Sequence, residues 1–110
     1  MEPAANNKDI YDQQLKDHKG VLLYFATLSC SVGEALEPKV RSLVQEKFPD
    51  LVFTFVDMNA VPEFAAAHQV FAEPTVLLFV DGREYLRKSR HIGMGELEMA
   101  IERIYRLAFE

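Results

Sequence analysis

Three apolar runs of strand length constrain the fold of this 110-residue chain more than any other feature. They occupy residues 21–26, 51–56 and 75–80, and nearly every side chain in them is apolar. A strand with one face in water alternates apolar and polar residues, whereas a strand covered on both faces does not. The runs are also rich in β-branched and aromatic residues, which favour strands. We therefore predict a sheet that is covered by helices on both faces.

The segments around these runs show the periodicity of amphipathic helices. The expected helices cover residues 9–19, a stretch from 30 or 33 to 47, residues 62–68, and a closing segment through 97–108. Asp81-Gly82 is a hairpin signal, followed by a more polar strand over 83–92 that Gly93 and Gly95 end. Early alternation of strand and helix indicates parallel pairing, and the late hairpin adds antiparallel strands.

These elements predict an α/β fold, with a central mixed sheet of four to five strands flanked by helices on both faces. We assign residues 9–110 to a single domain and residues 1–8 to a flexible lead-in. No apolar stretch approaches the roughly 20 residues that span a bilayer. The first residues lack the basic start and apolar core of a secretory signal. We expect a cytoplasmic protein without membrane association.

The charge balance argues against a nucleic-acid partner. The chain carries 17 acidic and 12 basic residues, for a formal net charge of −5, and this average field repels a phosphate backbone. Basic residues gather only in the expected polar strand, at Arg83, Arg87, Lys88 and Arg90, where they resemble a solvated strand face. The three histidines lack the spacing of metal ligands. No metal and no cofactor is expected.

Several short motifs, taken in order, resemble those of the thioredoxin family. Residues 29–33, Ser-Cys-Ser-Val-Gly, follow the first apolar run, where the family has its Trp-Cys-Gly-Pro-Cys active site. The other matching segments are Pro38, residues 56–59, Glu73-Pro74-Thr75, Asp81-Gly82 and Ile92-Gly93. The resemblance covers about Asp9 to Phe109. It implies a thioredoxin fold in which the Glu73–Pro74 peptide bond is cis.

The departures from the family pattern fall on residues that carry its chemistry. Cys30 is the only cysteine, and Gly33 stands where the family has the cysteine that resolves a mixed disulfide. Tyr24 and Phe53 stand in place of a buried Asp and a Lys, and we expect both in the core. Ser29 replaces the family's Trp. The resemblance thus implies an oxidoreductase-like protein without a resolving cysteine, with at most weak monothiol exchange through Cys30.

The expected partner is a protein or peptide thiol or disulfide, with glutathione as an outside thiol that releases it. By resemblance, the partner-contacting residues are Ser29, Ser31, Val32, Gly33, Phe71, Glu73, Pro74, Thr75 and Gly93, which would form a groove for an extended segment. The resemblance places Cys30 at a helix N-terminus, which favours a thiolate. Glu73 and Glu34 oppose this effect, so we expect the pKa of Cys30 to stay near that of an ordinary cysteine.

Two other functions remain open. The chain could be a non-catalytic module that binds a partner in the same groove, in which case Cys30 is unused. In that groove Phe71 is either an exposed anchor or a core side chain. A glutaredoxin-like role in glutathione or iron–sulfur binding is the weaker alternative. Cys30-Ser31-Val32-Gly33 shares only its leading cysteine with the Cys-Gly-Phe-Ser motif of those proteins.

Overall fold

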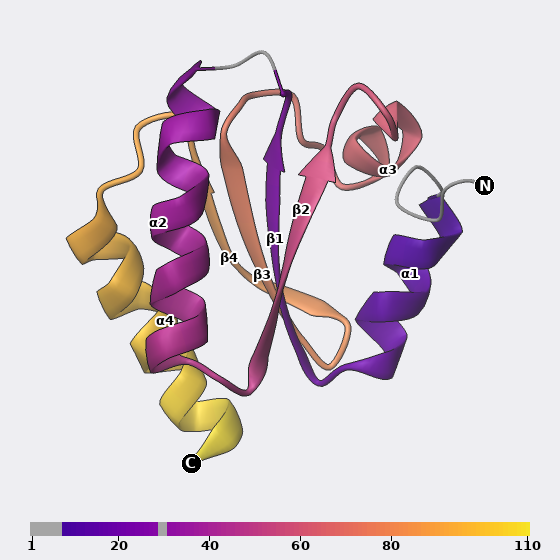
Figure 1. Cartoon of the computed structure of the whole chain (residues 1–110). Coiled ribbons are helices and arrows are strands. Elements are labelled where there is room, and N and C mark those ends of the chain that lie inside the picture. Colours follow the sequence, from indigo (N-terminus) through magenta and orange to yellow (C-terminus); the bar gives the residue numbers. More distant parts are fainter. Residues whose placement is uncertain (1–7, 29–30) are drawn as a thin grey trace.

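The computed structural model describes residues 8–28 and 31–110, which form alternating strands and helices around one sheet (Figure 1). The elements in chain order are α1 Lys8–Asp17, β1 Gly20–Ala26, α2 Ser31–Lys47, β2 Leu51–Asp57, α3 Pro62–Ala67, β3 Thr75–Val80, β4 Arg83–Ser89 and α4 Met94–Phe109. Each of the three apolar runs forms a strand, and Asp81-Gly82 forms the hairpin turn between β3 and β4.

The four strands lie in the order β2-β1-β3-β4, so β1 and β3 are central. β1 pairs in parallel with β2, and β3 pairs antiparallel with both β1 and β4. In this register Phe25 lies opposite Thr75, and Ala26 lies opposite Asp57. The end of β1, the end of β2 and the start of β3 therefore meet at the same edge of the sheet. This edge positions the candidate site.

Helices cover both faces of the sheet, as the lack of alternation in the strands predicts. Figure 1 shows α2 and α4 on one side and α1 and α3 on the other. The residues of β1 alternate between two core clusters. Leu22, Tyr24 and Ala26 pack with α2 and α4, whereas Val21, Leu23 and Phe25 pack with α1 and α3. Every residue of β1 is buried.

Tyr24 and Phe53 are core residues, as expected from the sequence. Tyr24 is completely buried, and Phe53 is partly buried against the same cluster. Their ring centroids lie 6.2 Å apart, within the range of favourable aromatic pairs. The guanidinium of Arg41 lies 5.8 Å from the Phe53 ring centroid on the outer side. Neither aromatic side chain supplies an acid or base that could move a proton near neutral pH.

Several expected boundaries differ from the structure. Lys8 belongs to α1 rather than to the lead-in, and residues 1–7 lie outside the described residues. β4 ends at Ser89, because the backbone of Arg90 has a φ of 65° and is no longer extended. The Arg90 N–H still donates to the Pro74 carbonyl at 2.8 Å, in register with the β3–β4 pairing. Gly93 and Gly95 do not end the strand: Gly93 is the N-terminal cap of α4, and Gly95 lies in the first turn of that helix. Tertiary packing of the apolar α4 face, including fully buried Leu97, overrides the weak helix propensity of glycine.

Candidate functional site

A pair of hydrogen bonds joins the end of β1 to the segment before β3. The backbone N–H and the side-chain hydroxyl of Thr27 both donate to Oε1 of Glu73, each at 2.8 Å. The sheet register explains this meeting. Because Phe25 pairs with Thr75 in antiparallel strands, the residues just beyond each strand end lie opposite one another. Forty-six positions of sequence separate the two partners.

A second set of contacts holds the backbone around Pro74. The Glu73–Pro74 peptide bond is cis, and the Pro74 side chain is buried. The hydroxyl of Thr75 donates to the Ala72 carbonyl at 2.7 Å and lies 3.1 Å from the hydroxyl of Ser89 on β4. Thr75 is only 1% exposed. A buried hydroxyl with two partners satisfies its own polar atom and also fixes the loop that it contacts.

Two large apolar side chains stand in water on the loops that these bonds join. Phe71 is 78% exposed and Leu28 is 71% exposed. The prediction of an exposed Phe71 is confirmed, and its core alternative is excluded. Single exposed apolar residues are common on protein surfaces. Two of them on adjoining loops expose apolar area at the same edge of the sheet.

A hollow of about 260 Å³ opens beside Thr27, on the α2 and β2 side. Its lining residues are Thr27, Leu28, Glu34, Glu37, Arg41 and Phe55. Arg41 forms an ion pair with Glu37 one helical turn away, and Glu34 lies in the first turn of α2. The hollow is thus lined by both apolar and charged side chains.

The structure brings some of the predicted site residues together, whereas others lie outside the described residues. Phe71, Glu73 and Pro74 lie on the loop before β3, and Thr75 is the first residue of that strand. Glu73 joins this loop to Thr27, just after β1. Gly93 is the N-terminal cap of α4. Ser31, Val32 and Gly33 are the first residues of α2. Ser29 and Cys30 lie outside the described residues, and so do the expected geometry and pKa of Cys30.

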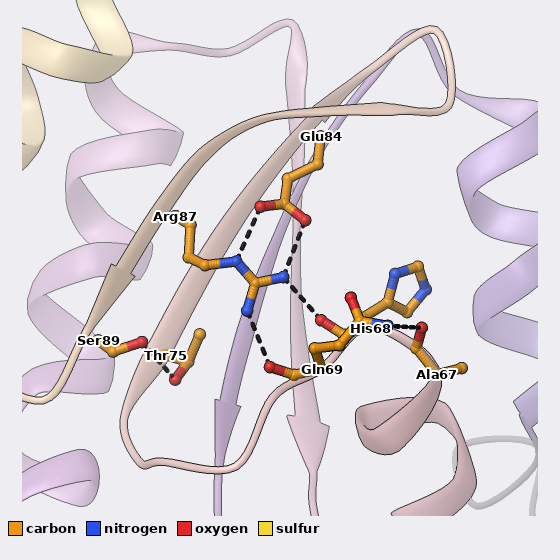
Figure 2. A network of polar contacts seen from close by, with 7 residues as sticks. All are labelled: Ala67, His68, Gln69, Thr75, Glu84, Arg87 and Ser89. Atoms are coloured by element: carbon orange, nitrogen blue, oxygen red, sulfur yellow. Dashed lines mark hydrogen bonds and ion pairs between the residues drawn. The ribbon is translucent and has the colours of Figure 1, made fainter.

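Two residues that sequence reasoning missed also belong to this region. Thr27 binds Glu73, which the sequence assigned to the partner groove and to an effect on the cysteine, but not to a bond with Thr27. The sequence signal for such a bond is Glu73 itself, a charged residue directly before Pro74 and the start of a buried strand, where it needs a polar partner. Arg87 was grouped with a solvated basic face, yet it donates to backbone carbonyls at the end of α3 (Figure 2). No local pattern marks Arg87, because those carbonyls are 18 and 19 positions away.

Across residues 8–28 and 31–110, no group of three or more His, Cys, Asp or Glu side chains is arranged to hold a metal ion. None of the helices in that part of the chain is long and apolar enough to cross a bilayer.

Comparison with known proteins agrees with this architecture. The family model described as Thioredoxin matches residues 2–103. Thioredoxin-like protein YdfQ of Bacillus subtilis is 36% identical over 93 residues, which cover 84% of this chain and 82% of that protein. Fasciola hepatica thioredoxin superposes with a TM-score of 0.78 at 27% identity, covering 86% of this chain and 91% of that one. Arabidopsis thaliana thioredoxin O2 reaches 0.79 at 19% identity, covering 91% and 90%, which shows the fold alone. Because the family match spans nearly the whole chain, this protein belongs to the thioredoxin family.

Proposed function

We propose that this thioredoxin-like protein captures a protein or peptide partner through Cys30, as a mixed disulfide that turns over slowly. The observation that carries the proposal is the double hydrogen bond from Thr27 to Glu73. It holds the loop bearing Leu28 against the loop bearing Phe71, and Cys30 follows Leu28 by two positions in the sequence. We infer that a partner that contacts both loops can be captured by Cys30, which follows the first loop in the sequence.

The chemistry begins with the thiolate of Cys30, which attacks one sulfur of a partner disulfide. A new S–S bond forms between Cys30 and that sulfur while the old S–S bond breaks. The second sulfur leaves as a thiolate and takes up a proton, so it is reduced as Cys30 is oxidised. Gly33 offers no thiol to reverse this step. An outside thiol such as glutathione attacks the partner's sulfur, forms a disulfide with it and releases Cys30 as a thiolate.

The residues around Cys30 in the sequence and fold support a thiol that reacts, but slowly. Cys30 directly precedes α2 in the sequence, and the free N–H groups and dipole of a helix N-terminus favour a thiolate. Glu34 in the first turn of that helix adds a negative charge that opposes this effect. The buried Tyr24 and Phe53 provide no proton carrier. A single thiol kept for exchange suits a reducing compartment such as the cytoplasm.

Incubation with oxidised glutathione, followed by intact-mass measurement, tests this function. The expected product is one glutathione adduct per chain, absent from the Cys30→Ser variant. An unmodified wild-type chain after prolonged incubation above pH 8 would refute the proposal. Gly33→Cys supplies the missing thiol, and this variant should reduce insulin faster than the parent protein.

A non-catalytic binding module is the second candidate, favoured by the exposure of Leu28 and Phe71. This function needs the loops but not the thiol. A candidate partner peptide would bind the Cys30→Ser variant as tightly as the wild type, whereas Phe71→Asp would weaken binding. Under the first proposal, Cys30→Ser instead abolishes covalent capture.

A further inference from the structure

Arg87 on β4 makes four hydrogen bonds with all three nitrogens of its guanidinium (Figure 2). Nη2 donates to the His68 carbonyl at 2.6 Å, and Nη1 donates to the Gln69 carbonyl at 3.0 Å. Nε and Nη2 donate to the two carboxylate oxygens of Glu84 at 2.8 and 2.9 Å. The bond from Arg87 lowers the pKa of the Glu84 carboxyl, which keeps the pair charged. Glu84 thereby orients the planar fork toward the two carbonyls.

Those carbonyls belong to His68, the C-terminal cap of α3, and to Gln69, which follows it. α3 has six residues and ends at Ala67, and a helix this short has little stability of its own. Gln69 has a φ of 54°, in the left-handed region that non-glycine residues seldom adopt. A cation beside a helix C-terminus is favourable, and here its hydrogen bonds also hold the two carbonyls just past the last helical residue. Arg87 therefore stabilises the turn through which the chain leaves α3.

Residues 68–73, which we call the pre-proline loop, are consequently held at both ends. Arg87 fixes the first two residues, and the N–H of buried Val70 donates to the Ala65 carbonyl at 2.9 Å. The far end is fixed by the bonds from Thr75 and Thr27 described above. Phe71 is the large apolar side chain that this fixed backbone presents to solvent. A preorganised contact residue loses less conformational freedom when a partner binds.

We infer that Arg87 is a positioning residue for partner capture, which acts by holding the pre-proline loop so that Phe71 contacts an extended peptide segment. The inference rests on the proposed function and adds the partner class, an extended segment with an apolar side chain beside its disulfide. The hydrogen-bond partners of Arg87 in the described part of the chain are Glu84, His68 and Gln69, so we expect it to act through the pre-proline loop. Its removal should therefore slow capture of a peptide and leave the intrinsic reactivity of the thiol unchanged.

Two probes with the same leaving group separate these effects. One is dithiobis(nitrobenzoate), a small disulfide with no peptide. The other is a synthetic ten-residue peptide that has leucines beside one cysteine, which is disulfide-bonded to thionitrobenzoate. Capture of either by Cys30 releases coloured thionitrobenzoate, so the rate constants are compared directly. Arg87→Ala should lower the peptide rate by about fivefold, in the range of a single interface contact, with the small-probe rate unchanged.

Matched variants sharpen the result. Arg106→Ala removes an exposed arginine that pairs with Glu102 on α4, so it serves as the control that alters neither rate. Arg87→Lys keeps the positive charge but not the planar guanidinium that bonds two carbonyls and a carboxylate. Its peptide rate should therefore stay as low as that of Arg87→Ala. Phe71→Ala should cause the same selective loss as Arg87→Ala. Combining the two should add little, because both act through one contact.

Equal peptide rates for wild type and Arg87→Ala, or an equal fall in both rates, overturn the inference while the proposed function stands. If wild-type protein reacts with neither probe, the proposed function fails instead. The inference is then decided by affinity, with a fluorescent peptide that carries serine in place of cysteine. Arg87→Ala should raise its Kd by about fivefold, and an unchanged Kd refutes positioning. Thermal unfolding of each variant confirms that the folded protein is being compared.

Discussion

Replacing Thr27 by Val tests whether the Thr27–Glu73 contact holds the two loops together. Valine keeps the shape of threonine but removes the hydroxyl that donates to Oε1 of Glu73 at 2.8 Å. The backbone N–H bond at 2.8 Å remains. A hydrogen bond to a charged group contributes about 1.5–3 kcal/mol. Because the pair is only partly buried, we expect Thr27→Val to lower the free energy of unfolding by about 1–1.5 kcal/mol, near or below the lower end of that range.

Urea unfolding followed by far-UV circular dichroism measures this change. Unfolding entropy near 60 °C is about 2.1 cal/mol/K per residue, which for 110 residues is about 0.23 kcal/mol/K. The expected loss therefore lowers Tm by about 4–6 °C. Glu73→Ala removes both bonds, and we expect it to cost about 2 kcal/mol. The double variant should cost clearly less than the sum of the two single changes.

The reasoning is refuted if the two substitutions are additive within about 0.5 kcal/mol, since uncoupled residues behave in that way. Thr54→Val provides a matched control. It removes a hydroxyl that donates to Gln14 Oε1 at 2.6 Å between β2 and α1, away from the candidate site. Both valine variants should be destabilised, but only Thr27→Val should also slow capture of the thionitrobenzoate peptide.

Three further predictions concern the stability of the fold. Burial lowers the pKa of His68, so the unfolded chain binds a proton more readily than the folded chain. The free energy of unfolding should therefore fall as the pH drops below about 6.5. Urea unfolding at several pH values should show a weaker pH dependence for His68→Gln than for the wild type. Gly20→Ala places a Cβ 2.5 Å from Leu51 Cδ2 and 2.8 Å from the Phe109 ring, and calorimetry should show a cost of about 1–3 kcal/mol. Tyr105→Phe removes both hydrogen bonds to Asp50, which urea unfolding should register as a loss of about 1 kcal/mol.

The fold follows from features that are local in the sequence. The three apolar runs specify strands buried on both faces, because strands without alternation require cover above and below. Asp81-Gly82 specifies the hairpin through its turn conformation, with both residues at positive φ. The order and spacing of short motifs from Asp9 to Phe109 indicate the family. The exposed position of Phe71 was anticipated as one of two alternatives, and only its 78% exposure chose between them.

The polar contacts of the candidate site were decided by tertiary structure. Thr27 and Glu73 are 46 positions apart, and they meet only because β1 and β3 pair in one antiparallel register. From the sequence, Arg87 is expected to be an exposed strand residue. Its partners include backbone carbonyls, which every residue has, so no residue type marks them in the sequence. Local propensity and periodicity report on neighbours along the chain. Bonds between distant segments depend on the register and packing of the whole sheet, which the complete fold alone defines.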